Sequence, residues 1–365
     1  MSEIKVNNIQ SLSGTNGPVI SGTVEMNSAG AMALPRGDTA YRGGRGRGIF
    51  GGGYGASSPY PELAAMDYVQ IATTGSGYDF GDLTTTGTVN GGVASSTRGL
   101  FFGGRRPGGG TSNIHTAIQY VTISSTGNSF FFGDLSYRPV LAMGASDNTR
   151  GLFAGGYNGI SPYVGPKGVG TTYTNIDYVT IASLSNASNF GDLTIGRCQS
   201  FSMSSPTRGV FGAGMFTTSG AASGTTYTNV IDYVTIQSRG NAIDFGDIIT
   251  ARVDSSYGNA GNSSTRGIIC SGDAASGDDN ELSYITLASK GDAIDFGDSI
   301  DKTAGSGGAG TSSQIRGVYR PASGNGDAAL ETTLIATLGN STAFGDLNTG
   351  RRVYGALSDS HGGLG

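Results

Sequence analysis

Short runs of apolar and aromatic residues, separated by polar and glycine-rich segments, recur along the chain about every fifty residues. The stretch 175–193, NIDYVTIASLSNASNFGDL, carries two such runs, and a third, Thr207-Arg208-Gly209-Val210-Phe211, follows it. Runs of about 4–7 residues rich in β-branched and aromatic residues predict strands rather than helices. A regular internal period of this size indicates a repeat architecture.

The run built around a tyrosine occurs six times and is always followed by Phe-Gly-Asp. Its copies cover 66–71, 118–123, 176–181, 231–236, 282–287 and, in degenerate form, 330–335. The phenylalanines that follow are Phe80, Phe132, Phe190, Phe245, Phe296 and Phe344. In five copies the tyrosine stands twelve residues before the phenylalanine, and Thr332 occupies its position in the sixth. This constant distance predicts a hairpin of fixed geometry.

An Arg-Gly step also occurs six times and begins another predicted strand. The arginines are Arg47, Arg98, Arg150, Arg208, Arg266 and Arg316, and an apolar pair with small residues usually follows. The distance from this arginine to the tyrosine varies, from 28 residues between Arg150 and Tyr178 to 18 between Arg266 and Tyr284. A constant framework with one variable loop per unit is typical of a scaffold with a variable face.

Each unit therefore has four predicted strands: a small-residue run such as Ser200-Phe201-Ser202-Met203, the Arg-Gly strand, the tyrosine strand and the Phe-Gly-Asp strand. No window of twelve or more residues shows a convincing helical apolar period, and 65 glycines disfavour long helices. Four-stranded units repeated around a ring form a propeller. We expect an all-β fold, a six-bladed β-propeller spanning 36–365, with an apolar core distributed between blades.

Two segments compete for the innermost strand of the first blade. The first is 36–46: Arg36 lies eleven residues before Arg47, just as Arg197 lies eleven residues before Arg208. The second is 351–357, which follows the last Phe-Gly-Asp. We predict that the more apolar C-terminal segment pairs with the first blade and closes the ring, because both open edges then find partners. In the alternative, residues 36–46 complete that blade.

Composition changes this picture little but excludes several classes of protein. Glycine is about 18% of the chain, well above the usual ~7%. The net charge of −5 gives no general argument for nucleic-acid binding. There is no run of ~18 apolar residues and no basic-plus-apolar leader, so we predict no membrane insertion and no signal peptide. Cys198 and Cys270 provide neither a disulfide framework nor metal spacing.

Residues 1–35 lie outside the repeat and are too few to enclose a core. Their apolar residues are Ile4, Val6, Ile9, Val19 and Ile20, set among Ser, Gly, Asn and Thr. One interpretation is a disordered leader. The other is an extended anchoring arm that becomes ordered against a partner by strand addition.

The order of elements over 36–365 resembles the kelch repeat: an arginine, a strand ending in Gly-Gly, a variable loop, a tyrosine strand and then an aromatic residue. Two features differ from that family. Phenylalanine replaces the usual tryptophan, and the glycine pair is lost at residues 270–272 and 319–320. The fifth and sixth blades are therefore expected to be the most irregular.

Residues 2–7 (SEIKVN) and 34–39 (LPRGDT) resemble the opening of tail-fibre and other virion proteins of marine phages, especially those of cyanobacteria. The repeats with Ile-Asp-Tyr-Val-Thr-Ile and Asp-Phe-Gly-Asp-Leu also resemble kelch-like repeats in such proteins. The resemblance implies a particle component, assembled in the host cytoplasm and located in the virion, with the arm as its anchor. Tail fibre and capsid or tail decoration both fit.

Motifs that imitate catalytic or binding sites are better explained by the repeat. The Asp-Phe-Gly triplets at 244–246 and 295–297 lack the other kinase elements. Residues 42–48 resemble an RNA-binding RGG tract but overlap the Arg-Gly motif of the first blade. His115 lies in a variable loop and His361 near the C-terminus, so no catalytic triad can be argued. We predict no enzyme, no catalytic residues, no cofactor and no metal site.

The variable loops are the predicted contact surface. Among kelch-like rings, ligands are usually bound by the loops between the Gly-Gly strand and the tyrosine strand. Here those loops contain Tyr157, Tyr163, Tyr173, Phe216 and Tyr227 among Gly, Ser and Thr. This composition suits protein or glycan recognition. The expected partners are other virion proteins and host-surface glycans, with homo-oligomers left open; the alternative is a soluble carbohydrate-binding or carbohydrate-active propeller.

Overall fold

The structure is a computed structural model of the full chain. It describes residues 46–55, 61–106, 113–158, 172–217, 225–253, 261–270, 272–274, 277–278, 280–300, 309–320 and 328–364. In these ranges the regular structure is β, apart from short 3-10 segments such as Gly362–Leu364.

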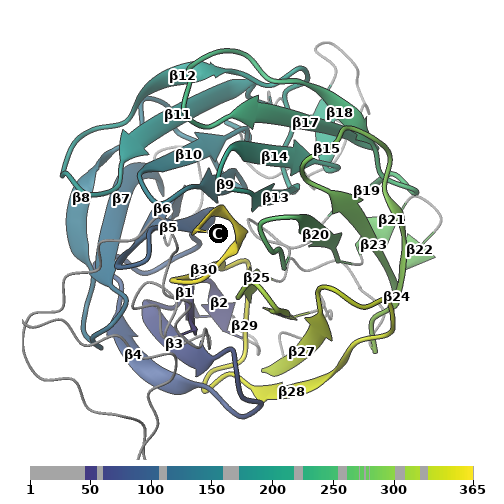
Figure 1. Ribbon diagram of the computed structural model, residues 1–365. Helices are drawn as coiled ribbons and strands as arrows, with labels where there is room; N and C mark the ends of the chain where they lie inside the picture. The colour runs from purple at the N-terminus through teal and green to yellow at the C-terminus, as the bar shows by residue number, and fades with distance from the viewer. Residues whose placement is uncertain are drawn as a thin grey trace, which may run out of the picture. The chain divides into compact units, whose positions relative to one another are not determined.

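Six antiparallel sheets lie around a common axis as the blades of a propeller (Figure 1). From the axis outward, blade 1 is β30 (Gly355–Ser358), β1 (Arg47–Gly51), β3 (Ala65–Gln70) and β4 (Tyr78–Asp82). Blade 2 is β5 (Gly91–Ala94), β6 (Arg98–Arg105), β7 (Ile114–Thr122) and β8 (Phe130–Asp134). Blade 3 is β9 (Met143–Ser146), β10 (Arg150–Ala154), β11 (Asn175–Thr180) and β12 (Ser188–Asp192).

The remaining blades follow the same order of strands. Blade 4 is β13 (Phe201–Ser204), β14 (Arg208–Gly212), β17 (Val230–Thr235) and β18 (Ile243–Asp247). Blade 5 contains β20 (Arg266–Ile269), β23 (Glu281–Thr286) and β24 (Ile294–Asp298), with an isolated bridge from Asn262 to Gly267 at the innermost position. Blade 6 is β25 (Gly310–Ser312), β26 (Arg316–Tyr319), β27 (Ala329–Leu334) and β28 (Thr342–Asp346). The predicted six-bladed propeller of four-stranded units is confirmed, and blade 6 is more regular than expected.

The C-terminal strand closes the ring. β30 pairs with β1 in the register Gly48↔Ser358 to Gly51↔Gly355. The predicted closure by the C-terminal segment is therefore confirmed, while residues 36–45 of the alternative lie outside the described residues.

The repeated arginine joins each blade to the next. In five blades it lies over the tyrosine ring of its own blade, which is a cation–π contact. The distances from guanidinium carbon to ring centroid are 4.5 Å for Arg47–Tyr68, 4.7 Å for Arg98–Tyr120, 4.9 Å for Arg150–Tyr178, 4.7 Å for Arg208–Tyr233 and 4.4 Å for Arg266–Tyr284. Its Nη1 also donates to a backbone carbonyl of the next blade, such as Ile123 O at 2.8 Å from Arg47. Arg316 makes the last such contact, to Ile71 O of blade 1.

The Phe-Gly-Asp motif forms the outer edge of each blade and contacts the next one. In blade 1, Met66 pairs with Gly81 and Asp67 with Asp79, so Phe80 is the extra residue of a bulge and is 1% exposed. A Cβ on Gly81 would lie 2.5 Å from the backbone of Gly127 in the turn of blade 2. The same close approach recurs from blade to blade and ends where Gly345 meets Gly75. The motif is therefore a seam between blades.

The C-terminus enters the centre of the ring (Figure 1). Gly362, Gly363 and Leu364 are all buried. The Nε2 of His361 lies 2.9 Å from Ala94 O of blade 2. The backbone carbonyl of His361 accepts a hydrogen bond of 2.9 Å from Nε2 of Gln314 in blade 6. This segment contacts the innermost strands of several blades.

Candidate functional site

The predicted contact residues belong to one side of the ring, which we call the loop face. It is the side on which the second strand of each blade leads to the third and the outermost strand leads to the next blade. Tyr157 follows β10, Tyr173 precedes β11, and Phe216 and Tyr227 lie between β14 and β17. Tyr163 and the predicted anchor residues lie outside the described residues. The predicted anchor residues are Ile4, Val6, Ile9, Val19 and Ile20.

The bases of the loops are not free segments, because they pair into small sheets. One sheet joins β2 (Tyr54–Gly55) to β29 (Arg351–Arg352), and another joins β15 (Met215–Thr217) to β16 (Thr225–Tyr227). A third contains β19 (Arg252–Val253), β21 (Asp273–Ala274) and β22 (Gly277–Asp278). In blade 3, Tyr157 bridges Val140 on one side and Thr172 on the other. Sequence reasoning missed these pairings; those of β2 with β29 and of β19 with β21 join segments that are distant in the chain.

Tyr157 is a packing residue in this structure. It is 5% exposed and belongs to an apolar cluster at the loop face. The buried members of that cluster are Ile114, Val140, Leu141, Tyr157, Cys198 and Met215. Burial raises the pKa of the Tyr157 phenol well above its usual value. Most of this ring is therefore inaccessible to a partner.

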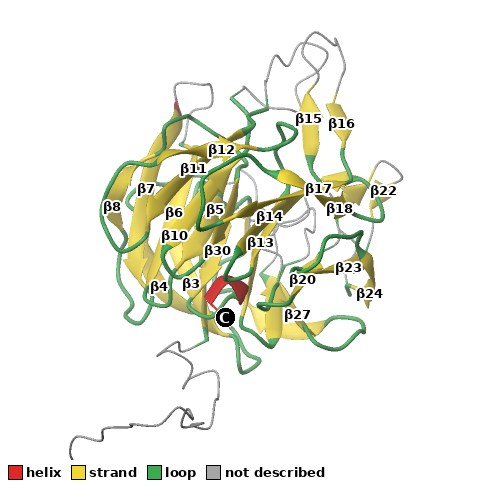
Figure 2. Cartoon of the chain, turned by 45° about the horizontal axis from the view of Figure 1, so that its top comes forward, coloured by secondary structure: helices red, strands yellow, loops and turns green. Residues whose placement is uncertain are grey.

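Tyr173, Phe216 and Tyr227 are half-buried and keep part of their rings accessible. Tyr173 packs edge-on against Tyr137, with ring centroids 4.9 Å apart. Tyr227 pairs with Met215 and packs on the apolar cluster. Phe216 is the next residue after Met215, so its side chain lies on the opposite face of this hairpin. Figure 2 shows β15 and β16 extending beyond the blade sheets, and Phe216 is thus the predicted residue best placed for contact.

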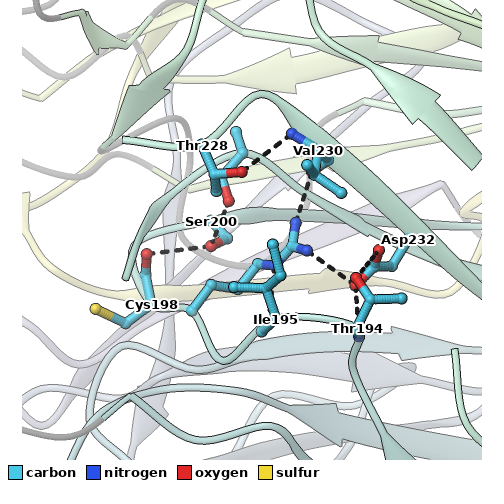
Figure 3. Close-up of polar contacts among 9 residues, drawn as sticks. Thr194, Ile195, Cys198, Ser200, Thr228, Val230 and Asp232 are labelled. Atoms are coloured by element: carbon cyan, nitrogen blue, oxygen red, sulfur yellow. Dashed lines mark hydrogen bonds and ion pairs between the residues drawn. The ribbon is translucent and has the colours of Figure 1, made fainter. Parts of the chain in front are cut away.

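Buried ion pairs support the base of the loop face. Nη2 of Arg197 lies 2.9 Å from Oδ2 of Asp232, and both side chains are fully buried. Thr194 donates from its backbone N (3.0 Å) and its hydroxyl (2.6 Å) to the same carboxylate (Figure 3). Burial lowers the pKa of Arg197, and the neighbouring Asp232 carboxylate opposes that shift. The pair fixes the connection between blades 3 and 4.

The same arrangement recurs in two other blades. Arg351 lies 2.7 Å from Asp67, and Arg252 lies 2.8 Å from Glu281. Sequence reasoning missed these pairs, although a signal existed: in three units an arginine stands seven residues after the phenylalanine of Phe-Gly-Asp. These arginines are structural, because each is buried and bound to a carboxylate of the next blade.

Three residues near the axis of the loop face adopt a left-handed backbone conformation. They are Leu141 (φ 60°), Gln199 (φ 54°) and Val353 (φ 55°), at equivalent positions in the connections between blades. A β-branched residue rarely adopts this conformation without surrounding constraint. The backbone N of Leu141 donates to Asn90 Oδ1 at 2.8 Å, and that of Gln199 donates to Leu141 O at 3.2 Å. The centre of this face is therefore held in a strained but hydrogen-bonded conformation.

His115 is not a loop residue, contrary to the sequence-based expectation. β7 begins at Ile114, and His115 pairs with Gly104 of β6. The structure gives its Nδ1 no hydrogen-bond partner among the described residues. Burial, with a smaller effect from Arg106, lowers the pKa of His115 to about 4. At neutral pH its imidazole is therefore uncharged.

Within the described ranges, no group of three or more His, Cys, Asp or Glu side chains could hold a metal ion. Cys198 and Cys270 are both buried and form no disulfide. No helix among the residues placed by the structure is long and apolar enough to cross a membrane.

Comparison with known proteins adds no family to this description. The chain matches no protein-family model, and no curated protein matches its sequence. The residues themselves define a six-bladed all-β propeller, compatible with protein or glycan contact, whose loop face carries three half-buried aromatic residues.

Proposed function

We propose that this chain is a non-enzymatic structural protein of a phage particle, displaying a kelch-like propeller for contact with proteins or host-surface glycans. Residues 1–35 attach it to the capsid or tail, as a fibre component or as a decoration. The likeness of residues 2–7 and 34–39 to virion proteins supports the location. The propeller fold supports a role in displaying a contact surface on the particle.

The observation that carries this proposal is the use of the repeated side chains. The arginine, the tyrosine and the glycine of Phe-Gly-Asp all serve contacts within a blade or between neighbouring blades. Their repetition therefore maintains a rigid ring, while differences between units are concentrated in the loop face. A rigid scaffold with a variable surface is the usual arrangement for a binding module. Many copies on one particle would raise avidity without tight individual sites.

The test of attachment is deletion of residues 1–35 in a phage that encodes this chain. We expect the ring to fold and to be missing from purified particles. Normal incorporation of the truncated chain would contradict the anchoring role. Circular dichroism of the purified fragment confirms that the ring itself is intact.

The test of contact is Phe216→Ala on the loop face, with Phe130→Ala as its matched control. Phe130 is 62% exposed and lies on the outermost strand of blade 2, away from the loops. We expect Phe216→Ala to weaken binding of particles to host cells and Phe130→Ala to leave it unchanged. Equal binding by both variants would contradict a contact role for this face.

A soluble carbohydrate-binding or carbohydrate-active propeller is the second candidate function. The half-exposed rings of Tyr173 and Phe216 favour it, because aromatic faces provide large, rigid contact area for a glycan. Glycan arrays and hydrolysis assays on the full chain distinguish the two. Binding without turnover agrees with both candidates, whereas turnover would exclude a purely structural role.

A further inference from the structure

Blade 6 lacks a side chain that the other five blades share. In those blades a tyrosine ring lies under the repeated arginine, with its centroid 4.4–4.9 Å from the guanidinium carbon. In blade 6 the position belongs to Thr332, and its cross-strand partner is Thr342. No aromatic ring among the described residues lies over Arg316.

Arg316 nevertheless keeps the position that the repeat assigns to it. It pairs with Leu334 as Arg47 pairs with Gln70, and its Nη1 donates to Ile71 O and Ala72 O, each at 3.2 Å. The guanidinium is therefore held by blade 1 even though no tyrosine ring supports it from below.

A hollow of about 240 Å³ lies beside Arg316. Arg316, Thr332 and Thr342 line it together with the turn 337–340 of blade 6 and Thr74 of blade 1. An apolar cavity of about 150 Å³ suffices to bind benzene in another protein. The hollow is therefore large enough for one aromatic ring.

Two exposed leucines stand on the rim of the hollow. Leu334 is 51% exposed and Leu338 is 60% exposed, and both line the hollow. The residues equivalent to Leu334 in the other five blades are Gln70, Thr122, Thr180, Thr235 and Thr286. At the position of Leu334, an exposed leucine thus replaces a polar residue only in the blade that lacks the tyrosine.

We propose that this hollow is a binding site for an aromatic side chain, a tyrosine or phenylalanine, presented by a partner chain. The ring enters beside Thr332 and Thr342, faces the guanidinium of Arg316 and contacts Leu334 and Leu338. The five complete blades contain the same ring–guanidinium pair as an internal contact. In blade 6 the aromatic ring of that pair comes from the partner chain instead. The proposal is independent of the phage assignment and concerns a surface away from the loop face.

The test measures binding of two probes to the full chain by NMR of leucine methyl groups. The probes are 4-methylphenol and the blocked tripeptide N-acetyl-Gly-Tyr-Gly-amide. We expect saturable shifts at Leu334 and Leu338 with both probes, in the millimolar range for a single ring. At least threefold weaker binding is expected for 4-methylcyclohexanol, which has a similar shape and hydroxyl group but no π face.

Three variants distinguish binding in this hollow from non-specific binding of the probes elsewhere on the surface. Thr332→Tyr restores the missing ring and should reduce binding of both probes at least tenfold. Thr180→Tyr adds a tyrosine to an intact blade and should leave binding unchanged. If Thr332→Tyr does not fold, Leu338→Ser on the exposed turn should weaken binding at least threefold.

Three results would overturn the proposal. They are absence of saturable shifts, unchanged binding in a folded Thr332→Tyr variant, and equal affinity for 4-methylcyclohexanol. Binding of 4-methylphenol without binding of the tripeptide would exclude a partner's side chain and identify a site for free phenols instead.

Discussion

Closure of the ring depends on Leu357, which makes this side chain the most direct test of the architecture. Leu357 lies on β30 opposite Ile49 of β1 and is fully buried. It packs with Phe101 of blade 2 in the core between the two blades. Leu357→Ala therefore removes apolar contact from the strand that joins the end of the chain to its first blade.

The loss of unfolding free energy expected for Leu357→Ala depends on how tightly the leucine side chain is packed. The two δ-methyl groups of Leu357 lie 2.6 and 2.7 Å from where a Cβ on Gly99 would stand, so they touch the backbone of β6 directly. Hydrogen-bonded strands surround the site on both sides and leave little room for collapse. Substitution of a fully buried leucine by alanine costs about 2–5 kcal/mol, with larger values where the cavity persists. We expect about 3–5 kcal/mol here.

The assay is equilibrium unfolding in guanidinium chloride, followed by circular dichroism. The control is Leu338→Ala, which removes the same atoms from a side chain that is 60% exposed and should change stability by no more than about 0.5 kcal/mol. If Leu357→Ala also stayed within that range, the C-terminal strand would not hold the ring together, and our account of closure would be wrong.

Three further predictions concern other contacts, all measured by unfolding. Gly345→Ala should lower the free energy of unfolding by about 1–3 kcal/mol more than Gly75→Ala. Both glycines have φ near +150°, but only a Cβ on Gly345 meets backbone atoms of the next blade. Equal losses in the two variants would refute the role of the motif as a seam between blades. Asp232→Ala should cost about 3–5 kcal/mol because it leaves the fully buried Arg197 unpaired; a loss below about 1 kcal/mol would contradict this. Because the pKa of His115 is about 4 in the fold, against an ordinary 6.5, the unfolded chain takes up this proton first. Stability should therefore fall by about 3 kcal/mol between pH 7 and pH 4, and His115→Leu should remove that part of the loss.

The fold could be predicted from the sequence because each repeated residue has one structural role per blade. Arg47 and its equivalents link neighbouring blades, and Phe80 and its equivalents fill each bulge, so their regular spacing reflects the geometry directly. Closure by residues 355–358 was also predictable, because an apolar strand was left over where an edge had to be paired.

The loop face could not be predicted in the same way. The bridge between Tyr157 and Val140 joins residues of two different connections, and no local pattern marks it. Leu141 and Val353 adopt left-handed conformations, which could not be predicted because leucine and valine rarely adopt them. Thr332 was visible as a gap in the repeat, but the hollow beside Arg316 emerges only when the turn of blade 1 is in place.

The pairing of β30 with β1 has a consequence for synthesis on the ribosome. Arg47 and Asp359, which hydrogen-bond to each other, are separated by 312 positions. At about 5–20 residues per second, the nascent chain grows for roughly 15–60 s before the partner of its first blade is translated. During that interval β1 presents an unpaired edge, so this protein should depend on chaperones or on delayed compaction while it is being made.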